Sequence, residues 1–323
     1  MKNSKVLRIS VTDRCDFRCV YCMPESGVTL VTPDDLLSYE EIETVARAAM
    51  GAGIRRFRLT GGEPLVRRGI EALVGKLARL GPDDLALTTN GSHLAEAAAT
   101  LKAAGLRRVT VSLDTLRRER FESITRRSGL DKVIEGISAA RRTGLEPVKI
   151  NMVVIRGVND DEIPDFVRFA ERERVEVRFI ELMPTSGLSS ECKELGSWRP
   201  ALFVKGEEIR RTITASFGPL EARPDADGVA RIYRTASGAR LGLITPVSEP
   251  FCAGCERLRL SADGRLRLCL FDKEGIDVKS VLREGRPGSR GLAALLRTAR
   301  RDKKKWERGS LAALSSDMFK IGG

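Results

Sequence analysis

Six of the seven cysteines in the 323-residue chain fall into two groups of three. The first triplet has the spacing C-x3-C-x2-C and the second the spacing C-x2-C-x13-C: Cys15, Cys19 and Cys22, then Cys252, Cys255 and Cys269. Thiolates are soft ligands that suit iron-sulfur clusters or zinc. Most clusters and structural zinc sites take four protein ligands, so three thiolates leave one metal position for a small molecule.

Zinc is the alternative for each triplet, and it would need a distant fourth ligand. His93 is the only histidine, and Cys192 is the only further cysteine. The usual fourth donors are therefore scarce, and we expect Cys192 to be an ordinary thiol in a loop. No fourth ligand is evident near the second triplet either. Considered by itself, that triplet fits zinc and an iron-sulfur cluster comparably well.

The composition indicates a folded protein in a reducing compartment. Hydrophobic residues make up 42% of the chain, which is enough for one large core or a main domain with a smaller partner. No apolar run approaches the roughly 20 residues needed to cross a bilayer, and the first residues lack the apolar core of a secretory signal. We therefore expect a cytoplasmic protein without a membrane partner, whose thiols are not paired in disulfides.

The formal net charge of +12 indicates an anionic partner. Nucleic acid is the common inference from such a charge, and a zinc-stabilised nucleic-acid-binding protein is one alternative. Only 5% of the residues are aromatic, however, and no signature of RNA or DNA binding is present. A small polyphosphate explains the charge equally well, and we expect no nucleic-acid partner.

The elements that must position the first triplet alternate between β-rich runs and stretches of helical period. Six strands are predicted: Val6 to Val11, Arg56 to Thr60, Leu85 to Thr88, Val109 to Leu113, Val148 to Ile155 and Val175 to Leu182. Ser38, three residues before Glu41, predicts a capping box at the start of the first helix. Eight such βα units close a TIM barrel, so six predict an incomplete (β/α)6 TIM-type barrel in an α/β protein.

After Pro184 the pattern changes. A Gly-, Ser- and Pro-rich connection around Thr185 to Pro200 is followed by a predicted helix near Glu207 to Ala215 and by strands near Ala230 to Thr235 and Arg240 to Ile244. We therefore expect a barrel domain over 1–190 and a smaller C-terminal α+β domain over 191–323, which carries the second triplet. The turn at Ser261 to Gly264 would bring Cys269 back toward Cys252 and Cys255.

The run CDFRCVYC after a first β-strand resembles the radical S-adenosylmethionine superfamily. The resemblance implies a [4Fe-4S] cluster whose fourth iron binds S-adenosylmethionine, which is then cleaved to a 5′-deoxyadenosyl radical. Thr60-Gly61-Gly62-Glu63-Pro64 ends the second predicted strand and resembles the superfamily element that contacts the methionine amino group. The segments at Thr88 to Gly91, Val111 to Asp114 and Glu181 to Met183 also fall at strand ends, where the active sites of such barrels assemble.

The second triplet, followed by Arg257-Leu258-Arg259, and the terminal Ile321-Gly322-Gly323 narrow the resemblance to the GTP 3′,8-cyclase family of molybdenum cofactor biosynthesis. That family cyclises GTP to (8S)-3′,8-cyclo-7,8-dihydroguanosine 5′-triphosphate. The resemblance implies a second [4Fe-4S] cluster that binds guanine through its open iron. The alternative is another radical S-adenosylmethionine enzyme with an auxiliary cluster, for example one that modifies a peptide.

Matching motifs imply a role for each of several residues. The six triplet cysteines would hold the metals. The implied S-adenosylmethionine contacts are Tyr21, Gly62, Ser112 and Met183. The implied GTP contacts are Arg8, Arg58, Thr89, Lys149, Arg257, Leu258 and Arg259. Arg257, Arg259, Gly322 and Gly323 are the implied catalytic residues, the two glycines through insertion of the tail into the active site. Arginine suits a triphosphate because it offers paired donors to phosphate oxygens.

The resemblance also implies partners: an external electron donor, and cyclic pyranopterin monophosphate synthase as the recipient of the product. The sequence leaves the oligomeric state open, a homodimer included. Two segments depart from the family pattern, namely 184–199 with its extra Cys192, and the lysine-rich run Lys303 to Trp306.

Overall fold

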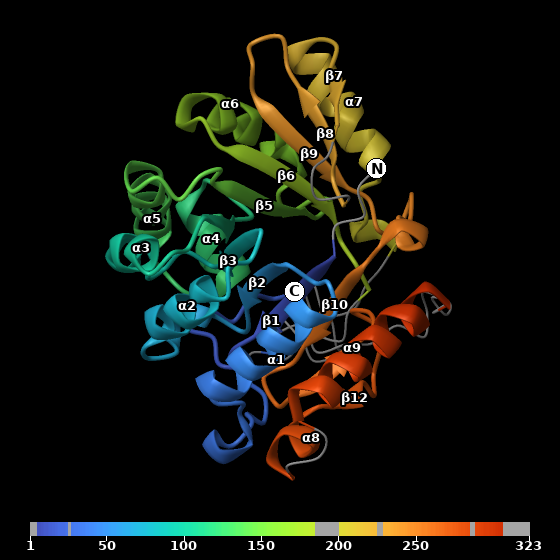
Figure 1. Ribbon diagram of the computed structural model, residues 1–323. Helices are drawn as coiled ribbons and strands as arrows, with labels where there is room; N and C mark the ends of the chain where they lie inside the picture. The colour runs from blue at the N-terminus through green and yellow to red at the C-terminus, as the bar shows by residue number, and fades with distance from the viewer. Residues whose placement is uncertain (1–4, 25–26, 185–199, 225–228, 285–287, 306–323) are drawn as a thin grey trace.

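The computed structural model describes residues 5–24, 27–184, 200–224, 229–284 and 288–305. The strands within these residues join a single twelve-stranded sheet in the order β12-β11-β10-β1-β2-β3-β4-β5-β6-β9-β8-β7 (Figure 1). Strands β1 to β6 are neighbours in chain order and run parallel to one another. The incomplete barrel therefore lies in the first 181 residues.

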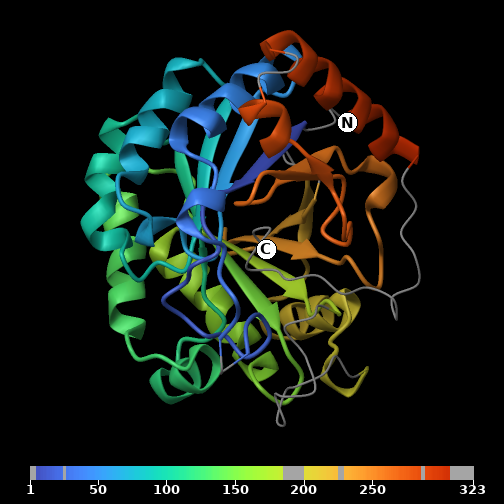
Figure 2. The same cartoon turned by 90° about the horizontal axis from the view of Figure 1, so that it is seen from below.

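The six strands coincide closely with the predicted ones. They are β1 (Val6–Ser10), β2 (Arg56–Thr60), β3 (Asp84–Thr89), β4 (Arg108–Ser112), β5 (Lys149–Val154) and β6 (Glu176–Glu181). Six helices connect them and form an arc around the outer face of the curved sheet (Figure 2): α1 (Tyr39–Gly51), α2 (Ile70–Arg79), α3 (Leu94–Ala103), α4 (Arg118–Thr125), α5 (Leu130–Arg142) and α6 (Ile163–Glu173). The prediction of an incomplete α/β barrel is confirmed.

The predicted capping box sets the start of α1. The Ser38 hydroxyl accepts a hydrogen bond from the Glu41 N–H at 3.1 Å, and the Glu41 carboxylate accepts one from the Ser38 N–H at 2.7 Å. Ile42, Val45 and Ala46 then recur at helical spacing and are fully buried against the sheet. The first helix is thus fixed both by its cap and by its apolar face.

The two faces of the sheet differ in polarity. Side chains alternate along a strand, so Leu7 and Ile9 of β1 pack under the helices while Arg8 points to the other face. The same alternation places Arg58 of β2 and Arg178 of β6 on the inner face. Closed TIM barrels fill this space with branched apolar side chains. Here the open barrel encloses a polar, cationic chamber.

The C-terminal region extends both edges of the barrel sheet. β9 (Arg240–Ile244) lies parallel to β6, with β8 (Arg231–Arg234) and β7 (Glu221–Arg223) antiparallel beyond it. β10 (Arg257–Leu260) lies parallel to β1, with β11 (Arg265–Arg267) and β12 (Ile276–Asp277) beyond it. The sequence predicted β8, β9 and the two strands on either side of the turn at Ser261 to Gly264. It predicted neither β7 and β12 nor the division of the strands between two edges. The domain boundary near residue 190 falls in a segment outside the described residues and stays a prediction.

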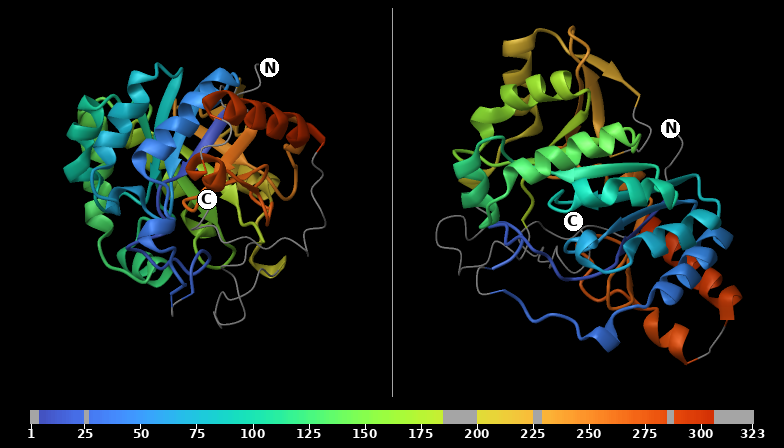
Figure 3. Two further views of the ribbon diagram at one scale, coloured as in Figure 1. Left: turned by 60° about the horizontal axis from the view of Figure 1, so that its bottom comes forward. Right: turned by 90° about the vertical axis from the view of Figure 1, so that its left-hand side faces the viewer.

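Three further helices belong to the C-terminal region: α7 (Gly206–Phe217), α8 (Lys279–Arg283) and α9 (Gly288–Lys305). α7 packs against α6, and α9 runs beside α1, as both views in Figure 3 show. Short 3-10 helices occur at Pro33–Asp35, Pro64–Val66, Asp160–Glu162, Pro200–Leu202 and Cys252–Gly254. Within the described ranges, no helix combines the length and the apolar character that a bilayer crossing requires.

Candidate functional site

The loop that carries the first triplet leaves β1 and is held by the backbone at the end of β2. The Gly62 N–H donates to Thr12 O and the Glu63 N–H donates to Arg14 O, each at 2.7 Å. A Cβ atom at Gly62 would lie 2.3 Å from Arg14 O, closer than real Cβ contacts come. Only glycine permits this approach, which gives the Gly-Gly-Glu-Pro element a structural role beside its predicted one.

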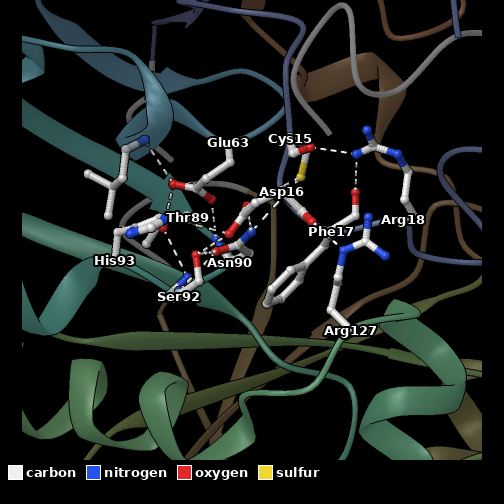
Figure 4. Close-up of polar contacts among 12 residues, drawn as sticks. Cys15, Asp16, Phe17, Arg18, Glu63, Thr89, Asn90, Ser92, His93 and Arg127 are labelled. Carbon is white, nitrogen blue, oxygen red and sulfur yellow. Dashed lines mark hydrogen bonds and ion pairs between the residues drawn. The ribbon is translucent and has the colours of Figure 1, made fainter. Parts of the chain in front are cut away.

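Arginine side chains support the same loop through its carbonyl groups. Arg18 donates to Cys15 O at 2.5 Å and to Phe17 O at 2.8 Å. Arg127, which follows α4, donates to Asp16 O at 3.1 Å (Figure 4). Because buried carbonyl groups need partners, these bonds fix the loop in the conformation that presents the thiols.

A polar network ties this loop to the end of β3. Asp16 accepts hydrogen bonds from the Asn90 side-chain amide and the Ser92 hydroxyl, each at 2.7 Å (Figure 4). His93 Nε2 lies 3.5 Å from the same carboxylate. The Asn90 amide nitrogen also lies 3.9 Å from Cys15 Sγ. The predicted strand-end segment Thr88 to Gly91 therefore reaches the first triplet.

Glu63 is the buried carboxyl group at the centre of this region. It accepts hydrogen bonds from the Thr89 hydroxyl at 2.8 Å, the Asn90 N–H at 2.6 Å and the Leu65 N–H at 2.9 Å. Burial raises the pKa of Glu63 to about 7, although these three bonds favour its charged form. A cationic ligand group beside it would restore the charge.

Tyr21 connects the cysteine loop to the end of β4. Its hydroxyl donates to Asp114 at 2.6 Å, and the other Asp114 oxygen accepts from the Val153 N–H at 2.8 Å. Burial raises the pKa of Asp114 to about 6. Ser112 lies two residues earlier on β4, in register with Asn151 of β5. Three of the predicted S-adenosylmethionine contacts, Tyr21, Gly62 and Ser112, are thus at or next to strand ends.

The thiols of the first triplet lie in apolar and acidic surroundings. Burial, followed by the charge of Glu63, raises the pKa of Cys15 to about 12. Burial and the neighbouring Cys22 raise the pKa of Cys19 well above its usual value. All six cysteines of the described chain are free thiols. A bound metal must therefore supply the positive charge that stabilises these thiolates.

The inner face of the sheet forms a cavity of about 1400 Å³, its open mouth included. Residues from both halves of the chain contribute basic side chains to it: Arg8, Arg58, Arg178, Arg257, Arg259 and Lys303. Arg8 is in register with Arg58 of β2 on one side and with Arg259 of β10 on the other. Like charges opposite one another in a sheet are destabilising, so this row of three arginines favours an anionic ligand.

The electrostatics of the arginine row agree with that interpretation. Burial and then the charge of Arg259 lower the pKa of Arg8 well below its ordinary value. Burial and then the charge of Arg257 lower the pKa of Arg259 to about 10. An anion placed among these groups would raise both pKa values again and relieve the repulsion.

The second triplet lines the same cavity. Cys252 and Cys255 lie on the connection from β9 to β10, which joins the two extended edges, and Cys269 follows β11. Burial opposes ionisation of Cys255, but the charges of Arg257 and Lys303 prevail and lower its pKa to about 7. Arg257 Nε lies 3.5 Å from Cys255 Sγ and its guanidinium stacks on Phe251. The predicted return of Cys269 by the turn at Ser261 to Gly264 is confirmed.

The donor set of each triplet is compatible with an iron-sulfur cluster. Each triplet supplies three free thiols, and three thiolates leave one iron of a [4Fe-4S] cluster without a protein ligand.

The predicted contact residues do not all meet in the cavity. Arg8, Arg58, Met183, Arg257 and Arg259 line it. Thr89 instead donates its hydroxyl to Glu63, and the Lys149 ammonium lies 3.5 Å from the Glu176 carboxylate at the start of β5 and β6. Leu258 alternates to the outer face and is buried in the core. Cys192, Gly322 and Gly323 lie outside the described residues, so their predicted roles stay predictions.

Sequence reasoning missed three polar residues that line the cavity, Asn151, Arg178 and Lys303. Asn151 Oδ1 is buried and has no hydrogen-bond partner in the part of the chain that the structure describes. Asn151 and Arg178 are in register on β5 and β6. For Asn151 and Arg178 the sequence did carry a signal. Each is a polar residue among apolar neighbours on its strand, and such a residue indicates a sheet face that is not packed as a core.

Two family models match the chain. The model of the radical SAM superfamily matches residues 9–170, and the model described as Molybdenum Cofactor Synthesis C matches residues 175–308. The chain is 49% identical over 297 residues to GTP 3′,8-cyclase from Pelotomaculum thermopropionicum, covering 91% of this chain and 89% of that protein. It is 46% identical over 289 residues to GTP 3′,8-cyclase 2 from Pseudomonas aeruginosa, covering 88% of this chain and 84% of that protein.

Solved structures also resemble the chain. The crystal structure of Streptococcus suis SuiB bound to S-adenosylmethionine superposes with a TM-score of 0.60. The superposition covers 90% of this chain and 68% of that one, at 16% sequence identity. At this identity the likeness shows a shared fold alone.

Proposed function

Because the chain belongs to the radical S-adenosylmethionine superfamily and, within it, to the GTP 3′,8-cyclase family, we propose that it cyclises GTP to (8S)-3′,8-cyclo-7,8-dihydroguanosine 5′-triphosphate. This reaction is the first step of molybdenum cofactor biosynthesis. The observation that carries the proposal is the cationic cavity, whose wall combines the row Arg8, Arg58 and Arg259 with the second cysteine triplet.

The first triplet would hold a [4Fe-4S] cluster at the end of the barrel where the parallel strands terminate. When bound there, the cluster and S-adenosylmethionine supply a 5′-deoxyadenosyl radical that can take a hydrogen from the ribose C3′ of GTP. Glu63 is placed to receive the methionine ammonium, because its carboxylate is fixed by three hydrogen bonds and is costly to charge without a cation. Tyr21, Gly62, Ser112 and Met183 surround this end of the barrel as the further proposed contacts.

The second triplet would hold a second [4Fe-4S] cluster and leave one iron for the guanine. Arg257 and Arg259 alternate onto the same face of β10 beside it. They are the proposed catalytic residues of the described chain, because they would place positive charge next to a GTP molecule whose guanine is bound at the second triplet. Arg8, Arg58 and Arg178 provide the remaining donors of the cavity for phosphate oxygens.

Thr89, Lys149 and Leu258 remain proposed GTP contacts. Each is engaged within the protein, and Leu258 could offer only its backbone. Gly322 and Gly323 remain proposed as a tail that enters the active site. An external electron donor, transfer of the product to cyclic pyranopterin monophosphate synthase and a cytoplasmic location complete the proposal, and a homodimer is compatible with it.

The direct test is anaerobic incubation of the iron-loaded protein with GTP, S-adenosylmethionine and a reductant. We expect 5′-deoxyadenosine and the cyclised nucleotide to form together, and about eight iron atoms per chain. Deoxyadenosine without consumption of GTP would retain the superfamily chemistry and discard the substrate. Zinc with little iron would contradict both clusters.

A further inference from the structure

Lys303 occupies an inward position on α9. The buried face of this helix contains Leu292, Leu296 and Ala299, all with at most 1% exposure. Residues three or four apart lie on the same face of a helix, and Lys303 comes four residues after Ala299. Lys304 and Lys305 are exposed. One lysine of the basic run therefore points inward, although the run as a whole reads as a solvated helix end.

The position of α9 is fixed by contacts other than Lys303. Arg300 donates to the Ala52 carbonyl at 2.7 Å, at the end of α1. Its guanidinium also lies 3.8 Å from Glu256, within the second-triplet segment. Figure 3 shows α9 lying beside α1, and the two helices are in contact. The placement of Lys303 thus follows from the packing of the whole helix.

The Lys303 ammonium reaches from α9 to the segment that carries Cys269. It donates to the Leu268 carbonyl at 2.5 Å, and Leu268 directly precedes Cys269. Lys303 also lines the cavity together with Cys252, Cys255 and Cys269. From β10, Arg257 approaches Cys255, and Arg259 lines the same cavity and interacts electrostatically with Cys255 and Cys269. The thiols are therefore flanked by fixed cations from two different elements.

Lys303 is partly buried, and its hydrogen bond to Leu268 holds the ammonium group beside the second triplet. Its positive charge is therefore held close to the thiols, unlike the charges of the exposed Lys304 and Lys305. Reduction adds negative charge to a cluster that already carries thiolate ligands, so a fixed positive charge nearby favours the reduced state. Hydrogen bonding to the backbone next to a ligand also fixes the direction of that ligand.

We propose that Lys303 is a positioning residue of the second metal centre, which orients the Leu268–Cys269 segment and raises the reduction potential of the cluster bound there. This inference rests on the proposed function, since it requires a cluster at the second triplet. It assigns a role to the lysine-rich run that departs from the family pattern.

The test compares Lys303→Met with Lys303→Arg and with the matched control Lys304→Met, each as the full-length, iron-loaded protein. The readout is a redox titration followed by electron paramagnetic resonance, using the signal that changes when GTP is added. We expect the midpoint potential of that signal to fall in Lys303→Met and to stay at the wild-type value in the other two. Iron content should remain at the wild-type level in all variants.

An unchanged midpoint in Lys303→Met, or an equal fall in Lys304→Met, would overturn the role of Lys303 and leave the second cluster intact. A wild-type protein without any GTP-sensitive signal would overturn the second cluster and, with it, this inference. If Lys303→Met loses iron from the second site, Lys303→Gln takes its place, because glutamine keeps a donor for Leu268 while it removes the charge.

Discussion

The two cysteine triplets lie in opposite electrostatic surroundings. The first triplet is contained in one loop, beside Glu63 and Asp16, and the pKa of Cys15 is raised to about 12. The second is assembled around β10 and β11, beside Arg257 and Lys303, and the pKa of Cys255 is lowered to about 7. The difference matches the proposed guests, since S-adenosylmethionine carries positive charge and GTP is a polyanion. Under this proposal, two sites with equal numbers of cysteines would differ in ligand because their surroundings differ in charge.

The largest expected effect comes from removing one cysteine of either triplet, because the two variants should differ in which reaction product they still form. Cys19→Ala should abolish 5′-deoxyadenosine formation, because the first cluster loses a ligand. Cys255→Ala should abolish the cyclised nucleotide while deoxyadenosine still forms. Each variant should lose about half of its iron, measured anaerobically after reconstitution. Deoxyadenosine from Cys19→Ala at the wild-type level would reverse the assignment of the triplets.

Thiol reactivity in the metal-free protein should differ next most strongly. At pH 7 about half of Cys255 is thiolate, whereas Cys15 is almost wholly protonated. The lower intrinsic nucleophilicity of an acidic thiolate offsets part of this difference, so we expect Cys255 to alkylate about a hundredfold faster or more. Iodoacetamide labelling followed by peptide mass spectrometry measures both rates in one sample. Equal rates would show that the surroundings do not differ in this way.

Arg259→Met should weaken GTP binding about tenfold to a hundredfold, as expected for the loss of charge-assisted hydrogen bonds worth about 1.5–3 kcal/mol. The same change should raise the melting temperature of the ligand-free protein, because it removes one cation from the row with Arg8 and Arg58. Calorimetry gives both quantities.

Arg211→Met is the matched control for this experiment. Its side chain on α7 is 73% exposed and pairs with Glu207, so both affinity and melting temperature should stay at the wild-type values. A fall in melting temperature together with affinity in Arg259→Met would indicate a structural arginine instead of a ligand-binding one.

The smallest expected effect concerns Glu63, the buried carboxyl group beside the first triplet. The pKa of Glu63 is about 7 in the folded protein against 4.5 for an ordinary glutamate side chain, so the folded state holds its proton more tightly. The associated stability is fully present below about pH 4.5 and is lost as pH rises through 7. Relative to Glu63→Gln, which cannot ionise, the metal-free wild type should lose at most about 3 kcal/mol between pH 4.5 and 8. Urea unfolding of both proteins at several pH values measures this loss, and parallel pH profiles would contradict the burial of a neutral carboxyl.

Much of this molecule could be predicted from local signals. The strands of the barrel, the Ser38–Glu41 cap and the triplets were recognisable because each depends on residues within a few positions of one another. The opposite placement of β9 and β10 was not, because it depends on pairing with β6 and β1, far away in the chain. Lys149 and Thr89 matched a motif, but their internal partners lie elsewhere in the chain: Glu176 on β6 and Glu63 in the segment after β2. From the sequence, Lys303 was noted only as part of a lysine-rich run that departs from the family pattern, because its contact with Leu268 depends on how α9 packs.

The division of the C-terminal strands between the two edges has a consequence for synthesis. A nascent chain that has emerged only as far as β6 holds a parallel sheet in which both β1 and β6 lack an outer neighbour. Bare sheet edges invite pairing with other chains. Translation must continue through β9 to cover the edge at β6 and through β10 to cover the edge at β1. β1 is made first, yet its outer partner β10 is made after β9. A pause or premature stop between residues 182 and 240 would therefore release a fragment prone to aggregation.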